Sequence, residues 1–315
     1  MSEYQYYEFR AVDEPLSEQQ LGEVRALSTR AEITPTSFVN EYHRGDFRGD
    51  PRDLVERYYD AFLYYANWGT RTLVLRLPKK LLEPSTATRY GVDTWTHKGD
   101  VLVSLGSDDE NADFVDQEFT LDALIEVRDE IAAGDTRPFY LDWLGRARIR
   151  LDEDTALPPP PAGLDALSDA QQTLAEFLRV DDELLAAVYG DPRPRRVDDL
   201  LQAAQQQRDE RDHRARLAQA RQVELERVQV AEAAARRAER LRGKEGESWA
   251  KVMRLVATYS PKDYDSAVAL LGDLHELSRR SGDQEEFFRR CAHLRAEFAR
   301  RPAFIRRLDE AGLPG

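Results

Sequence analysis

The chain contains a single cysteine, Cys291, so no disulfide can form within it. Its longest apolar runs extend over only a few residues, far fewer than the roughly 20 that a membrane-spanning helix needs. Residues Met1 to Phe9 are acidic and aromatic, whereas a signal peptide begins with basic residues and continues with an apolar stretch. These absences predict a soluble, cytoplasmic protein without a membrane segment.

Short catalytic motifs are also missing. The sequence has no phosphate-binding pattern G-x-x-x-x-G-K-[ST], no dinucleotide-binding pattern G-x-G-x-x-G, no zinc-protease pattern H-E-x-x-H and no hydrolase pattern G-x-S-x-G. We therefore expect no cofactor. An enzyme is not excluded by this, because catalytic carboxylates scattered along a chain leave no local pattern.

Glycine and proline are absent from Arg195 to Arg242, where charged residues and alanine predominate. This composition predicts one long helix, roughly 70 Å in length at about 1.5 Å per residue. Its apolar residues do not keep one heptad phase. Two interpretations stay open: a weak coiled coil with an alanine seam, through which 196–245 would self-associate, or a single solvated helix held by i,i+4 pairs.

The net charge of −14 is distributed unevenly. Residues 1–150 contain 18 basic and 28 acidic side chains, and residues 151–195 contain 3 and 10. Residues 196–315, with 24 and 21, have a small positive excess. Because an acidic surface repels a phosphate backbone, nucleic-acid binding is disfavoured for the first two-thirds of the chain. In the last third, arginines are interleaved with carboxylates.

The order of patterns predicts an α+β N-terminal domain followed by an all-α region. Alternating or buried apolar runs indicate strands at Tyr4–Val12, Thr72–Leu77 and in a hairpin around Lys98-Gly99. Asp50-Pro51 predicts the start of a helix that continues to about Gly69. The expected divisions are an α+β domain at 1–150, a proline-punctuated connector with short helices at 151–195, the long charged helix at 196–245 and a small helical bundle at 246–315.

Two sequence patterns resemble metal sites, and neither is complete. Cys291 and His293 form a C-x-H pair, but the chain has no second cysteine to extend it. Cys291 also lies on the apolar side of its helix, which predicts a buried core thiol. Asp109, Asn111 and Asp113 match the start of a calcium loop, yet Phe114 and Thr120 stand where glycine and glutamate are required. No metal site is predicted.

The loop around residues 43–53 is the strongest candidate for ligand binding. It combines a histidine, arginines, aspartates and two glycines just before the start of a helix, where backbone N–H groups attract anions. A simple turn with surface ion pairs is the alternative, since Asp50 is expected to cap the helix itself. The predicted ligand-binding residues are His43, Arg44, Asp46, Arg48 and Arg52.

Aromatic residues are unusually dense between Tyr58 and Trp68. If this segment is a helix, two of its faces are aromatic, and one face would be free to contact a partner. Core packing is the other interpretation. The predicted partner-binding residues are Tyr59, Tyr64 and Trp68 here, with Phe287 and Phe298 in the C-terminal bundle.

Two stretches resemble known bacterial families. The segments "STRAEITPTSFVNEYHRGDFRGDP", "YYDAFLYYANWGTR" and "LAEFLRVDDELLAA" resemble a bacterial family of unassigned activity. The stretch "YDSAVALLGDLHELSRRSGDQEEFFRRCAHLRAEFARRPAFIRRLDEAGL" (264–313) is similar to the helical tail of bacterial SWIM-type zinc-finger proteins. The zinc motif of that family is absent from this chain. The resemblance therefore implies a helical module and no metal.

These observations favour a non-enzymatic adaptor or scaffold for protein–protein interaction, which links two modules through a long helix. Two alternatives remain. The first is a ligand-binding or enzymatic α+β domain that uses the 43–53 loop. The second is a nucleic-acid-associated protein that uses the arginine-rich helix. The partner's identity does not follow from the sequence.

Overall fold

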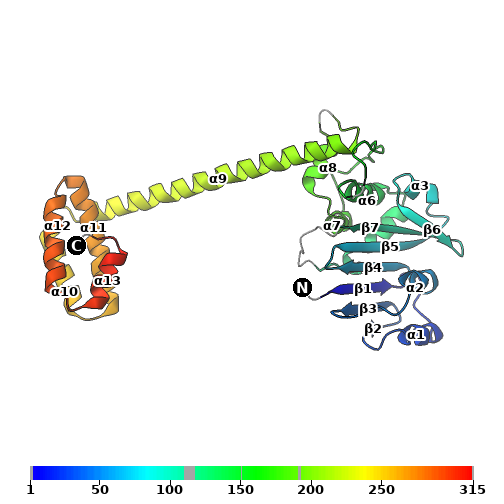
Figure 1. Ribbon diagram of the computed structural model, residues 1–315, viewed down its shortest axis with the longest axis horizontal. Helices are drawn as coiled ribbons and strands as arrows, with labels where there is room; N and C mark the ends of the chain where they lie inside the picture. Colours follow the sequence, from blue (N-terminus) through cyan, green and yellow to red (C-terminus); the bar gives the residue numbers. More distant parts are fainter. Residues whose placement is uncertain (1–2, 110–117, 150, 191–192, 314–315) are drawn as a thin grey trace. The chain divides into compact units, whose positions relative to one another are not determined.

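The computed structural model describes residues 3–109, 118–149, 151–190 and 193–313. The chain divides into two compact units, Met1–Arg211 and Asp212–Gly315 (Figure 1). The first combines a β-sheet with helices and the second is helical, so the predicted α+β region followed by an all-α region is confirmed.

A seven-stranded antiparallel sheet organises the first unit. Its strands follow the order β2-β3-β1-β4-β5-β7-β6 (Figure 1). The hairpin between β6 and β7 turns at Lys98 and Gly99, both at positive φ, as the sequence predicted. The strands are β1 (Gln5–Arg10), β2 (Glu32–Ile33), β3 (Ser37–Tyr42), β4 (Ala61–Ala66), β5 (Thr70–Pro78), β6 (Asp93–His97) and β7 (Asp100–Asp108).

Helices cover both faces of this sheet. Two of them, α1 and α2, pack against the face that carries Phe9, Phe62 and Val74. The others pack with the opposite face, which carries Leu63, Leu73 and Leu105. The helices are α1 (Glu18–Arg25), α2 (Pro51–Arg57), α3 (Pro84–Thr88), α4 (Leu121–Leu124), α5 (Glu126–Ala132), α6 (Arg137–Ala147), α7 (Asp169–Phe177) and α8 (Asp182–Val188).

The predicted helix from Pro51 to Gly69 is wrong in its second half. Helix α2 ends at Arg57, and the aromatic residues after it form strand β4 between β1 and β5. A central strand covered on both faces is apolar at consecutive positions, so it lacks the alternation that identifies a half-exposed strand. The chain passes from α2 to β4 at Asp60, whose buried carboxylate accepts the backbone N–H groups of Val12 and Asp13 at 2.7 and 3.0 Å. These bonds fix the start of the strand.

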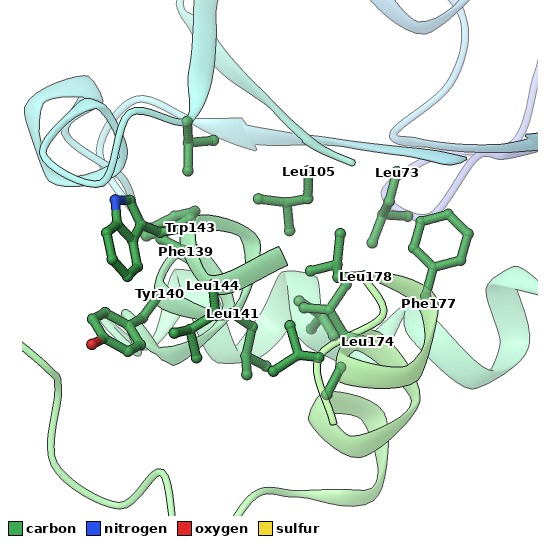
Figure 2. Close-up of a cluster of buried hydrophobic side chains, with 14 of the residues drawn as sticks. Leu73, Leu105, Phe139, Tyr140, Leu141, Trp143, Leu144, Leu174, Phe177 and Leu178 are labelled. Carbon is green, nitrogen blue, oxygen red and sulfur yellow. The ribbon is translucent and has the colours of Figure 1, made fainter. Parts of the chain in front are cut away.

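The segment 151–195, expected to be a connector, contributes to the main core of the first unit. Leu174, Phe177 and Leu178 of α7 and its C-terminus are fully buried. Figure 2 shows them beside the α6 side chains and beneath Leu73 and Leu105 of the sheet. The observed division at Arg211 therefore differs from the expected boundary at 150.

Helix α9 (Val197–Glu239) is the long helix that the sequence predicts. Its first turns belong to the first unit, where Val197, Leu200 and Ala204 are buried in the core. Near its other end, Ala238 is buried and Arg237 forms an ion pair with Asp273 at 3.0 Å in the second unit.

The second unit is a bundle around one apolar core, as expected for 246–315. The helix that begins after Asp283 has no side-chain cap, because the Asp283 side chain accepts no hydrogen bond from its first turn. The backbone N–H of that residue instead donates to Ser278 at 3.0 Å, closing the turn at Gly282. The bundle helices are α10 (Glu245–Ala257), α11 (Pro261–Ser281), α12 (Gln284–Glu297) and α13 (Pro302–Glu310).

Within the described ranges, none of the helices combines the length and the apolar character needed to cross a membrane.

Candidate functional site

The structure separates the five residues of the 43–53 loop that were predicted to bind a ligand. Arg44, Asp46 and Arg48 line one surface hollow of about 400 Å³. His43 faces elsewhere, with its ring 5.3 Å from that of Tyr4. Arg52 lies in α2 and is also engaged elsewhere. The loop therefore brings together three of the five predicted residues.

Arg52 belongs to a polar cluster on the α2 side of the sheet. Its Nε donates to Glu56 at 3.1 Å, and its guanidinium lies 4.3 Å from the centre of the Trp95 ring. The indole N–H of Trp95 donates to the same carboxylate at 2.8 Å, and His97 Nδ1 lies 3.2 Å from it. These contacts join α2 to strand β6 and leave Arg52 outside the hollow.

The loop itself is fixed by the strand beside it. The hydroxyl of Tyr7 donates to Asp46 at 3.1 Å, and the side-chain amide of Gln5 donates to the carbonyl of Gly45 at 3.2 Å. Asp50 caps α2 by accepting the backbone N–H of Arg52 at 2.8 Å, as predicted. The carboxylate of Asp50 therefore occupies the helix N-terminus, which removes that N-terminus as an anion site.

Three of the five predicted partner-binding residues are buried in the cores. Tyr59 is fully buried under the sheet, and Phe287 and Phe298 lie in the core of the bundle. They are unavailable to a partner while the chain is folded. Their burial therefore contradicts the prediction that they contact a partner. Tyr64 is partly buried and donates to Gln5 at 3.2 Å. Only Trp68, which is 39% exposed in the turn after β4, is accessible.

A second hollow, which the sequence did not indicate, lies where strand β7 extends past β6. It has a volume of about 330 Å³. Pairing between β6 and β7 ends at Ser104, so the backbone N–H of Gly106 points away from β5 and donates to Asp142 of α6 at 2.8 Å. Arg146, one helical turn later, donates to the other Asp142 oxygen at 2.9 Å. The sequence signal that could have indicated this hollow is the pair of an aspartate and an arginine four residues apart in a helix whose other residues are mostly buried.

Asp142 is 2% exposed, and burial raises the pKa of its carboxyl to about 6, although the Arg146 guanidinium and the Gly106 N–H act in the opposite direction. Each carboxylate oxygen accepts one of these donors, so the group orders α6 against β7. Ser107 also lines this hollow. Its buried hydroxyl has no hydrogen-bond partner among the described residues.

The exposed part of α9 is the third candidate site. Every residue from Asp209 to Ala233 is exposed. Within this segment five aliphatic side chains are between 44% and 68% exposed: Leu217, Val223, Leu225, Val228 and Val230.

The described residues contain no cluster of three or more side chains suited to holding a metal ion. Cys291 is buried in the bundle core, as predicted, and burial raises the pKa of its thiol to about 11. Asn111 and Asp113 of the partial calcium loop lie outside the described residues.

Comparison of the chain with models of protein families, with curated proteins and with solved structures finds no match. The resemblances of 27–70, 174–187 and 264–313 to bacterial families stay predictions.

Proposed function

We propose that the protein is a non-enzymatic adaptor in which α9 binds helices of partner chains and links the two folded units. The observation that carries this proposal is the exposure of α9 from Asp209 to Ala233, together with the five aliphatic side chains on that segment. Isolated helices are marginally stable in water, and most helices in proteins are stabilised by packing of an apolar face. This segment has such side chains but no described residues packed over them.

The positions of these side chains support binding on two sides of the helix. At about 100° per residue, Leu217, Leu225 and Val228 lie within about 80° of one another. Val223 and Val230, seven residues apart, lie on roughly the opposite side. Burying such a side chain fully contributes up to about 1.5–3 kcal/mol, so covering either stripe with a helical partner would stabilise the complex. This arrangement also explains why no single heptad seam is visible in the sequence.

The ion pairs along α9 favour a protein partner over nucleic acid. Arg227 and Arg236, and Arg242 just beyond the end of α9, each lie within 3.6 Å of a glutamate three or four residues earlier. Arg208 and Arg211 pair with Asp181 and Glu183 of the first unit. Neutralised arginines attract a phosphate backbone weakly.

The first experiment measures both self-association and partner capture. Sedimentation velocity of the purified full-length chain, over a range of concentrations, distinguishes a second copy from other partners. Affinity capture of the tagged chain from its own cells, followed by mass spectrometry, identifies a different protein. We expect a stoichiometric complex in at least one of the two measurements.

Two stripe variants assign the complex to α9. One replaces Leu217, Leu225 and Val228 with Glu, and the other replaces Val223 and Val230 with Glu. Glutamate favours helix, so both variants should fold normally and lose the complex. A matched control replaces Gln219 and Gln222 with Glu, which changes the charge of the same exposed segment without removing apolar surface. If both stripe variants retain the complex, α9 is not the binding element.

A further inference from the structure

The surface hollow that Arg44, Asp46 and Arg48 line has features of an anion-binding site. It lies between the turn at residues 26–30, which follows α1, and residues 44–48, which follow β3. Its volume of about 400 Å³ falls within the range of small-molecule sites. Arg30 contributes to it from the first segment, and Arg44 and Arg48 contribute from the second.

These three arginines are not neutralised by ion pairs. Arg30, Arg44 and Arg48 are exposed and make no ion pair with any residue that the structure describes. By contrast Arg52 and Arg57, a few residues later, pair with Glu56 and Asp53 at 3.1 Å. Three guanidinium groups around one hollow repel each other, and a bound anion relieves that repulsion.

One carboxylate also lines the hollow. Asp46 lowers the local positive charge from three to two. Its Oδ1 accepts the Tyr7 hydroxyl at 3.1 Å and the backbone N–H of Phe47 at 3.1 Å. These two bonds hold the loop in place. The hollow therefore keeps a net positive charge within an acidic region of the chain.

The hydroxyl groups of Ser28 and Tyr42, which also line the hollow, are arranged as donors. Asn40, which is 4% exposed, directs its two amide protons to Ser28 Oγ at 3.1 Å and Tyr42 Oη at 2.7 Å. Ser28 Oγ also accepts the backbone N–H groups of Arg30 and Ala31. Because both oxygens act as acceptors here, and neither hydroxyl donates to a described residue, both protons are available to a ligand.

We propose that this hollow binds the phosphate group of a small phosphorylated molecule. Guanidinium groups bind phosphate oxygens through paired, charge-assisted hydrogen bonds, and the two hydroxyls add further donors. The ligand is a small molecule because residues 1–195, with 21 basic and 38 acidic side chains, repel a polyanion. This inference is independent of the adaptor function, since it uses no residue of α9.

Isothermal titration of the full-length protein with pyrophosphate at low ionic strength tests the proposal. We expect saturable binding in the micromolar to millimolar range. The double variant Arg44→Gln/Arg48→Gln should bind at least about tenfold more weakly, since it removes two guanidinium groups and their charge-assisted hydrogen bonds to the phosphate oxygens. Tyr42→Phe removes one donor and should weaken binding by a smaller factor.

The matched control is Arg25→Gln/Arg89→Gln, which makes the same charge change at two exposed arginines outside the hollow. It should bind pyrophosphate like the unmodified protein. Absence of saturable binding by the unmodified protein overturns the proposal. An equal loss of binding in the control and in the Arg44/Arg48 variant overturns it as well, because the effect would then reflect overall charge.

Discussion

At the scale of single residues, buried carboxylates connect the helices and loops of the first unit to its sheet. Each is at most 3% exposed and accepts a backbone N–H from a different segment of the chain. A carboxylate without such donors would be costly to bury. The pairs are Glu8 with Leu121 at 2.8 Å, Asp60 with Val12 at 2.7 Å and Asp142 with Gly106 at 2.8 Å.

The raised pKa of Asp142 predicts a pH dependence of stability. Its pKa rises from an ordinary value of 3.8 to about 6, so the folded state binds more protons than the unfolded state between these pH values. The contribution to stability is therefore complete below about pH 4 and is lost as the pH rises through 6. Relative to Asp142→Asn, which does not titrate, the unmodified protein should lose roughly 2–3 kcal/mol from pH 4 to pH 7.

Hydrogen exchange of α6 peptides in urea, at pH 4 and pH 7, measures this difference locally. Asp93→Asn is the control, because Asp93 is exposed and lines the same hollow. A difference between Asp142→Asn and the unmodified protein that does not vary with pH would contradict the prediction.

Cys291 predicts a slow thiol reaction. The side chain is 3% exposed, and burial raises the pKa of its thiol to about 11, so little of the reactive thiolate exists at neutral pH. Labelling with a thiol reagent should become fast only when the bundle opens. Labelling in the native state at the rate of a free peptide thiol would show that the bundle core is not closed.

At the scale of elements, two helical glycines differ in their surroundings and predict opposite effects of alanine. A methyl group at Gly145 of α6 would lie 2.7 Å from the carbonyl oxygen of Leu178, so the glycine permits the close approach of this helix to the end of α7. A methyl group at Gly272 of α11 would meet nothing within 4 Å. The first glycine is needed for packing, and the second only weakens its helix.

Gly145→Ala should therefore destabilise the first unit by about 1–3 kcal/mol through overpacking. Gly272→Ala should stabilise the second unit by about 0.5–1 kcal/mol through helix propensity. Urea unfolding of the full-length chain, followed by hydrogen exchange of α6 and α11 peptides, measures each effect in its own unit. Two effects of the same sign would show that the contacts of Gly145 are not tight.

At the scale of the whole molecule, the boundary between the folded units lies inside α9. The first unit needs the segment after residue 150, because Leu174, Phe177 and Leu178 complete the core beneath the sheet. The core also includes Val197 and Leu200 at the start of α9. A folded first unit therefore extends into the long helix.

Two fragments test this boundary. The fragment 1–211 should unfold cooperatively, with the same midpoint as the corresponding transition of the full-length chain. The fragment 1–150 should show no cooperative transition, since it exposes the apolar surface that α7, α8 and α9 cover. Circular dichroism during urea unfolding measures both. Cooperative unfolding of 1–150 would restore the boundary that the sequence predicted.

Local sequence determined most elements and the long helix. Chain breaks, caps and periodicity act over a few residues, which is why the helix start at Asp50-Pro51, the Lys98-Gly99 hairpin and α9 were correctly predicted. The amphipathic pattern of the bundle and the burial of Cys291 followed for the same reason.

Tertiary packing decided the rest, because the deciding contacts join residues far apart in the sequence. Residues 61–66 form a strand since β1 and β5 lie on either side of them, although their spacing also fits a helix. The structure places the predicted loop arginines at two different sites. Arg52 contacts Trp95 and Glu56, whereas Arg44 and Arg48 line a hollow together with Arg30. No local pattern contains the position of Arg30, Ser28 and Tyr42 around that hollow, since only the folded sheet brings them together.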